Sequence, residues 1–332
     1  IMPVKVLNFP SVVLQHFLVG LTSTELFELT QCSLKSKDRV RPYEKSNKTF
    51  RMAVDFQRNW VDIRGVYRFY VKELVDGKLP KTYGKMGVRE FGDKKVQVEL
   101  DENEKTINIF WPTTEKEDRT FAVMKVAEHF IYTLGLGEFE SVTLGQENHA
   151  GRIIDWANEK NLNIANFTIG NVDKEHDDVD KVAEKLYSAS FFKKVSANFK
   201  CLINPTEAFK PNEFLPGIPK NTNMIFFHGA HWMTIDTLKD FTACSVILYD
   251  CKFTNKDINE FIKLWKNKEF ERIFYISINV PQGSGFKLTE VIAGLDGFGE
   301  IENDATTMKR EDGKEIEVSV LDEKKQIRIV VD

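Results

Sequence analysis

Histidine and cysteine side chains gather between residues 228 and 251, where they could bind a metal ion. His228 and His231 follow an apolar run at a spacing of three, and Cys244 and Cys251 come soon after. Imidazole and thiolate groups are common zinc ligands, but structural zinc sites take them in short paired spacings that this sequence lacks. We therefore expect no metal site, and interpret these residues as strand-end histidines beside buried thiols.

Other patterns that carry chemistry are incomplete. The acidic run DKEHDDVDK at 173–181 lacks the glycine and the terminal glutamate of a calcium loop, so Asp173 or Asp177 is expected to favour a helix start. The glycines at 283–285 have neither the strand-to-helix context nor the lysine of a phosphate-binding loop. No G-x-S-x-G or H-E-x-x-H motif occurs. We expect no catalytic residue and no cofactor, and the chain is predicted not to be an enzyme.

The composition argues against two classes of partner. The 332 residues include 46 Lys and Arg against 50 Asp and Glu, a formal net charge of −4 that provides no basic surface for nucleic acid. The longest apolar stretch, 9–21, is interrupted by Gln15 and His16 and is too short to span a membrane. Four cysteines without framework spacing, and a start that lacks a signal peptide, predict reduced thiols in a cytoplasmic protein, with a nuclear location also open.

Residues 8–41 predict a small helical unit. Apolar side chains recur at helical spacing, at Val13, Leu14, Phe17, Leu18 and Leu21, and then at Leu26, Leu29 and Cys32. Pro10 suits the first turn of a helix, and Pro42 ends the unit. A unit of this size buries little surface alone, so it needs a partner, either the rest of the chain or another protein.

The remaining sequence alternates between strand and helix patterns. Residues 50–113 have the two-residue period of strands joined by tight turns, and 117–136 returns to a helical period that ends at Gly135. Six strand-like cores follow, several of them separated by helix-period segments: 141–145, 165–170, 193–201, 224–229, 245–250 and 272–280.

These six cores recur at steps of 21 to 30 residues, which favours a leucine-rich-repeat-like solenoid with parallel strands. A doubly wound sheet would give the same alternation without a fixed step, and is the alternative. Antiparallel strands near the C-terminus are expected to form a hairpin that caps the last repeat. The predicted fold class is therefore α/β: a small N-terminal helical unit, then a leucine-rich-repeat-like α/β solenoid with a terminal β-hairpin cap.

Two parts of the sequence resemble known families. The N-terminal unit resembles an F-box; the matching residues are Phe9, Pro10, Val13, Leu14, Leu18, Leu21, Glu25, Leu26, Leu29, Cys32 and Ser33. Residues 231–267, HWMTIDTLKDFTACSVILYDCKFTNKDINEFIKLWKN, are similar to the type-2 F-box-associated domain of nematode F-box proteins, as is the later KREDGKEIEVSV. We therefore expect an F-box at 8–45, a β-hairpin and helix segment packing on the solenoid at 46–140, and a leucine-rich-repeat-like F-box-associated domain at 141–332.

The resemblance implies the substrate-recognition subunit of a Skp–cullin–F-box ubiquitin ligase, in which other subunits perform the catalysis. Its F-box would bind the Skp-family adaptor, and through it the cullin scaffold, by Phe9, Pro10, Val13, Leu14, Phe17, Leu18, Leu21, Glu25, Leu26 and Leu29. The C-terminal domain would bind a protein target. The alternative is a non-catalytic inhibitory module that sequesters its partner directly, without ubiquitylation.

The target is expected at the ends of the strands and on a proline-rich rim. Side chains just past each strand of a solenoid face its concave side without being needed for packing; here they include Gln146, Asn171, His228, His231 and Lys252. The segment 203–222 contains four prolines and adds Phe209, Phe214 and Leu215, which are expected to be exposed as anchors for a partner.

Overall fold

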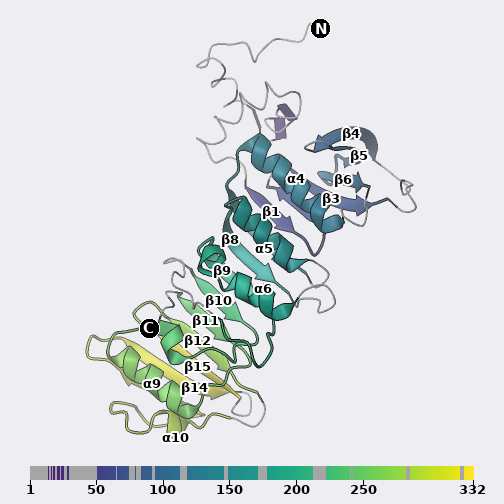
Figure 1. Cartoon of the computed structure of the whole chain (residues 1–332). Helices are drawn as coiled ribbons and strands as arrows, with labels where there is room; N and C mark the ends of the chain where they lie inside the picture. The colour runs from purple at the N-terminus through teal and green to yellow at the C-terminus, as the bar shows by residue number, and fades with distance from the viewer. Residues whose placement is uncertain are drawn as a thin grey trace. The chain divides into compact units, whose positions relative to one another are not determined.

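The computed structural model divides the chain into two compact units, Ile1–Asn148 and His149–Asp332 (Figure 1). The residues that it describes are Leu14, His16, Leu18, 21–22, 24–25, 28–29, 51–64, 66–74, 79, 84–91, 94–112, 118–145, 149–170, 178–211, 222–239, 241, 243–281, 285–321 and 325–332. They contain fifteen strands and seven helices. None of the helices in this described part is long and apolar enough to cross a membrane.

The first unit is a mixed sheet packed against a helix. Its elements are β1 (Met52–Asp55), β2 (Trp60–Ile63), β3 (Tyr67–Glu73), β4 (Lys85–Phe91), β5 (Lys94–Asp101), β6 (Thr106–Trp111), α4 (Arg119–Leu134) and β7 (Glu138–Leu144). Across the sheet the order is β7-β1-β2-β3-β6-β5-β4, and β1 with β7 and β3 with β6 are parallel pairs.

Helix α4 covers this sheet through aromatic contacts. The ring of Phe130 lies 4.6 Å from that of Phe69 and 6.1 Å from that of Phe91, measured between ring centres. Asp118 caps the helix by accepting a hydrogen bond from the amide of Phe121 (2.7 Å), and Gly135 ends it with a φ of 67°. The helix predicted to end at Gly135 is therefore confirmed.

The second unit begins with a run of parallel strands and continues with antiparallel ones. Its strands are β8 (Asn163–Ile169), β9 (Val195–Cys201), β10 (Met224–Phe227), β11 (Ser245–Leu248), β12 (Tyr275–Asn279), β13 (Ala305–Lys309), β14 (Glu315–Leu321) and β15 (Gln326–Val331). Its helices are α5 (Ala150–Glu159), α6 (Val179–Leu186), α7 (Ala189–Phe192), α8 (Ile235–Lys239), α9 (Asn255–Lys266) and α10 (Leu288–Val291). The order is β8-β9-β10-β11-β12-β15-β14-β13, and Figure 1 shows α5, α6 and α9 on one side of these strands.

Alternate side chains of the parallel strands are fully buried beneath these helices. Phe167 on β8 lies opposite Phe199 on β9, with ring centres 5.6 Å apart, and Phe227 on β10, which lies opposite Cys201, has its ring centre 5.5 Å from that of Phe199; the three form a ladder of rings. Helix α7 adds Phe191, 5.0 Å from Phe167, and Phe192, 4.6 Å from Phe199. Because strand side chains alternate between two sides, a slip of one strand by one residue would move its phenylalanine from the packed side to the other side. Burial of the ladder therefore favours the observed register of these strands.

The predicted fold class is wrong, because the described residues form mixed sheets. The strands expected in the second unit are present, and β8 to β12 are parallel with helices between several of them. However, β15 pairs with β12 along Tyr275–Asn279, so the last three strands continue the sheet instead of capping a solenoid. In the first unit, β7 was expected to be the first strand of the solenoid, but it also pairs in parallel with β1, so the sheet continues past it. A two-residue period predicts that a segment is a strand and leaves its partner undetermined. The helical unit expected over 8–45 lies almost entirely outside the described residues.

Arg310 joins helix α9 to the turn between β13 and β14. Its side chain is 2% exposed, and its guanidinium carbon lies 4.8 Å from the centre of the Trp265 ring. Nη1 donates to the carbonyl oxygen of Trp265 (2.7 Å), while Nη2 donates to Asp312 (2.7 Å) and Glu271 (3.2 Å). The guanidinium therefore satisfies acceptors from three parts of the unit at once.

Replacing Arg310 with methionine should lower the free energy of unfolding by about 2 kcal/mol, because the buried carbonyl of Trp265 loses its donor. Methionine keeps much of the packing over Trp265, so the lost stability would come mainly from the missing hydrogen bonds of the guanidinium. Arg310→Lys keeps the charge but not the planar guanidinium, and its free energy of unfolding should lie between those of the wild type and Arg310→Met. Urea denaturation measures the change; an Arg310→Met variant as stable as the wild type would contradict this role.

Asp312 should make stability depend on pH in the acid range. The hydrogen bond from Arg310 lowers the pKa of this carboxyl to about 2, below its ordinary value of 3.8. A carboxyl whose pKa is lower in the folded state stabilises the fold above its unfolded pKa, and loses that effect as pH falls from about 4 to about 2. Melting temperatures across this range should therefore fall more steeply in the wild type than in Asp312→Asn. Parallel curves would exclude the coupling.

Candidate functional site

The parallel strands of the second unit present a half-buried surface opposite the phenylalanine ladder. We call this surface the open face; it consists of Asn166, Thr168, Asn198, Lys200, Met224, Phe226, His228, Ser245, Ile247, Tyr249 and Tyr275. Each of these side chains is half-buried, whereas the ones that alternate with them, such as Phe199 and Val246, are fully buried. Such alternation is typical of a sheet with one packed side and one side reached by solvent. The open face is therefore available for contact with another molecule.

The centre of the open face is apolar and aromatic. Phe226 pairs in register with Ile247 on the next strand, and its ring centre lies 5.4 Å from that of Tyr249. The ring of His228 stacks on Tyr249, with centres 5.7 Å apart and planes 9° apart. On the other side, the ammonium of Lys200 lies 5.4 Å from the centre of the Phe226 ring. A half-exposed aromatic centre of this kind is a common feature of protein-binding surfaces.

The edge of the open face carries polar groups. Asn198 on β9 donates from Nδ2 to Oδ1 of Asn166 on β8 (2.5 Å). Beyond β10 and β11, His228 Nδ1 lies 3.2 Å from Asp250 Oδ2, and both side chains are 39% exposed. Asp250 has a φ of 56°, a left-handed conformation that aspartate adopts more readily than most residues. The predicted position of His228 at a strand end is therefore observed, beside a carboxylate.

His231 and Lys252, which were expected to face a target, instead hold another part of the chain. His231 donates from Nε2 to the carbonyl oxygen of Thr206 (2.8 Å), and Lys252 forms an ion pair with Glu207. Thr206 donates from its amide (2.8 Å) and from its hydroxyl (2.6 Å) to the carboxylate of Asp180. These contacts fix the residues that follow β9 over the ends of the neighbouring strands.

Gly229 allows this segment to approach closely. Its φ is 62°, and a Cβ at this position would lie 2.5 Å from Oδ1 of Asn204. A side chain here would collide with the segment and would strain the backbone. The close approach explains why a glycine directly follows His228.

Phe209 is buried, contrary to its expected exposure on a proline-rich rim. Its side chain is 7% exposed, and its ring centre lies 6.0 Å from that of Tyr187 and 6.4 Å from that of Trp232. Tyr187 also contacts Phe227, so Phe209 extends the aromatic core beneath the sheet. Phe214 and Leu215, the other two predicted anchors of the proline-rich segment, lie outside the described residues, as do the predicted target-binding residues Gln146 and Asn171.

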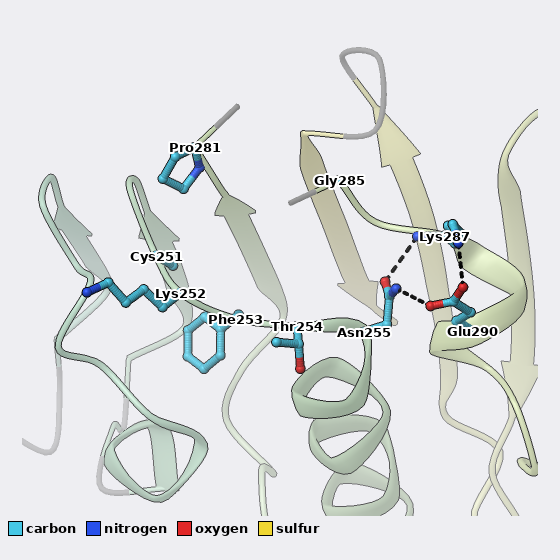
Figure 2. A pocket seen from close by; sticks show the side chains of 9 residues that line it. All are labelled: Cys251, Lys252, Phe253, Thr254, Asn255, Pro281, Gly285, Lys287 and Glu290. Carbon is cyan, nitrogen blue, oxygen red and sulfur yellow. Dashed lines mark hydrogen bonds and ion pairs between the residues drawn. The ribbon is translucent and has the colours of Figure 1, made fainter. Parts of the chain in front are cut away.

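A pocket of about 550 Å³ lies beyond the ends of β11 and β12, at the start of helix α9 (Figure 2). Figure 2 shows its lining residues: Cys251, Lys252, Phe253, Thr254, Asn255, Pro281, Gly285, Lys287 and Glu290. Asn255 donates to Glu290 (2.7 Å) and accepts from the amide of Lys287 (3.0 Å), while Lys287 donates to Glu290 (2.7 Å). The charged groups on this side of the pocket therefore satisfy one another.

Two thiols of the second unit, Cys201 and Cys251, are buried. Burial raises the pKa of the Cys201 thiol to about 11, and Cys201 lies 3.5 Å from the hydroxyl of Tyr187. Burial also raises the pKa of Cys251. A thiol with a raised pKa is a poor nucleophile and a poor metal ligand at neutral pH. Among the described residues, no cluster of three or more His, Cys, Asp or Glu could hold a metal ion.

The acidic run at 173–181 contains the N-cap of helix α6, at Asp178. Asp178 caps α6 by accepting hydrogen bonds from the amides of Asp180 and Lys181, both at 3.2 Å. Its contacts with Lys181 and these amides lower the pKa of Asp178. Asp173 and Asp177 lie outside the described residues.

Half of the expected adaptor-binding residues are described. Leu14 and Leu18 are helical and only 4% and 1% exposed, so both are buried within the chain itself. Leu21 and Leu29 are half-buried, and Glu25 is exposed and accepts hydrogen bonds from Thr22. The others, Phe9, Pro10, Val13, Phe17 and Leu26, lie outside the described residues.

The most central residues of the open face were missed in the sequence. Lys200, Phe226 and Tyr249 lie within or directly after the predicted strands, whereas the predicted binding residues lie past the ends of those strands. The signal that could have found Lys200 is the alternation in ANFKC, where Phe199 and Cys201 are core formers; MIFF is apolar throughout and gives no such signal for Phe226. The intervening residues must then lie on the opposite side of the sheet.

Replacing Phe209 with alanine should lower the free energy of unfolding by about 3 kcal/mol, because a buried ring leaves a cavity between Tyr187 and Trp232. Phe226→Ala is the matched control: it removes the same ring from the half-buried open face and should cost clearly less. Thermal and urea denaturation measure both. Equal losses would show that Phe209 is no more a core residue than Phe226.

One comparison with known proteins identifies part of the second unit. Residues 213–278 match the family model described as F-box associated. The match includes β10, α8, β11 and α9 and therefore the centre of the open face. No curated protein and no solved structure matches the chain. The similarity noted for residues 231–267 is thus confirmed at the level of the domain: the second unit contains an F-box-associated domain.

Proposed function

We propose that this chain is a substrate-recognition subunit of a Skp–cullin–F-box ubiquitin ligase. Residues 8–45 would bind the Skp-family adaptor, and the open face of the second unit would bind a protein target. The F-box associated match at 213–278 carries this proposal, because such domains accompany F-boxes. In this arrangement the chain positions the target, and the catalytic steps belong to other subunits.

The composition of the open face supports binding of a protein. Phe226, Ile247 and Tyr249 provide a contiguous apolar centre, while Asn166 and Asn198 provide amide groups at its edge. Interfaces between proteins commonly combine an apolar centre with a polar rim. The pocket at the start of α9 could accept a side chain of the same target, because its volume of about 550 Å³ exceeds that of any amino-acid side chain.

Of the predicted adaptor-binding residues that the structure describes, those with accessible side chains are the candidates for the contact. Leu14 and Leu18 are buried, and their truncation would disturb packing within the chain. Leu21 and Leu29 are half-buried and can still contact a partner. We therefore expect these two leucines to contribute to adaptor binding.

Replacing Leu21 and Leu29 together with alanine should weaken binding to a purified Skp-family adaptor by at least about thirtyfold, as expected for the loss of one or two interface anchors. Isothermal titration calorimetry measures the dissociation constant. Leu79→Ala, at a leucine 39% exposed in the first unit, is the matched control and should bind as the wild type does. If the wild-type chain does not bind the adaptor, the ligase proposal fails.

Direct sequestration of a partner is the second candidate. The observation that favours it is the burial of Leu14 and Leu18, which leaves these two predicted adaptor anchors packed within the chain itself. A chain that binds its target through the open face, but does not bind the adaptor, would favour sequestration.

A further inference from the structure

We propose that the open face recognises a protein segment that carries a carboxylate beside an apolar side chain. The carboxylate would pair with Lys200, and the apolar side chain would pack on Phe226 and Ile247. This inference rests on the proposed function, since it specifies the chemistry of the target at that site.

Lys200 is the unbalanced charge of this surface. Of the other charged groups on or beside the open face, Arg328 donates to Glu317 (3.3 Å) on the adjoining antiparallel strands, and Asp250 has the His228 ring 3.2 Å from its carboxylate. Among the described residues, no carboxylate forms an ion pair with Lys200; its contact is with the ring of Phe226. A partner with a carboxylate at this point would complete the charge balance of the face.

The position of Lys200 favours such a contact. It lies in register between Thr168 of β8 and Phe226 of β10, so its backbone is held from both sides. Its ammonium lies 5.4 Å from the centre of the Phe226 ring, an arrangement in which the ring attracts the cation and limits the conformations of the side chain. A cation that is already held in place loses less conformational entropy when a carboxylate binds.

The apolar half of the recognised segment follows from the neighbours of Lys200. Phe226 and Ile247 are adjacent in register, and Met224 and Tyr249 extend the same patch along their strands. All four side chains are half-buried, so a partner would remove their remaining surface from water. A carboxylate alone would leave this patch exposed, whereas an apolar side chain beside it would cover both features.

A basic residue is disfavoured beside Lys200. A basic segment would place a second cation against Lys200, and like charges at an interface are strongly unfavourable. Nucleic acid would need several cations aligned along its backbone, and the described part of the open face offers Lys200 without a second unpaired one.

Selection from a library of short random peptides, displayed on phage, tests the proposal with the full chain as bait. Peptides selected by the wild type should be enriched in Asp or Glu next to an aliphatic or aromatic residue. Lys200→Glu should select peptides enriched in Lys or Arg instead, because the charge at the site is reversed. Lys256→Glu is the matched control: it makes the same change on an exposed lysine of α9, among the helices, and should select as the wild type does.

Fluorescence anisotropy with a selected synthetic peptide makes the test quantitative. Lys200→Gln should weaken binding about fivefold and Lys200→Glu about tenfold or more, as expected for loss and reversal of a partly exposed ion pair. Exchanging the peptide carboxylate for a lysine should restore binding to Lys200→Glu. Peptides without acidic enrichment, equal binding by Lys200→Gln, or no selected peptide at all would overturn the inference. Adaptor binding, measured separately, reports on the proposed ligase role whatever the peptides show.

Discussion

The register of strands β8 to β10 determines which side chains of the second unit face its core and which face outward. Phe167, Phe199 and Phe227 form a ladder on the packed side, with centres between 5 and 6 Å apart, and α7 packs two more phenylalanines against it. Since side chains alternate along a strand, the ladder also assigns Lys200 and Phe226 to the open face. Packing on one side of the sheet therefore determines the chemistry that is displayed on the other.

The local elements of this fold could be predicted from the sequence, and their partners could not. The strands at 165–170, 193–201, 224–229 and 245–250 are present, because runs of aromatic and branched residues favour extended backbone wherever they pair. The terminal strands were predicted to be antiparallel. The pairing of β15 with β12 could not be predicted, because a local sequence pattern does not say which strand edge is free to pair. The regular spacing of strands along the chain favoured a repeat. The same spacing, however, is found in any sheet in which strands and helices alternate, so it could not identify the fold.

Several residues that were expected to bind a target make contacts within the chain. His231 and Lys252 do lie past the ends of strands, but their hydrogen-bond partners are Thr206 and Glu207 of the same chain. Phe209 lies in a polar stretch of sequence, which suggested exposure, and is nevertheless covered by Tyr187 and Trp232. Contacts between residues distant in sequence decide both cases. A polar residue after a strand is as able to bind its own chain as to bind another.

The pairing of β15 with β12 has a consequence for how this recognition surface can change. A parallel run with a free final edge can lengthen by one more strand and helix, which enlarges the surface without altering what is already there. Here the backbone groups of β12 are occupied from Tyr275 to Asn279 by an antiparallel neighbour, so no further parallel strand can be added after it. The run of parallel strands that forms the open face therefore ends at β12. A new binding specificity of the open face must then come from substitutions of its outward side chains. The inward residues that alternate with them remain constrained by their packing in the core.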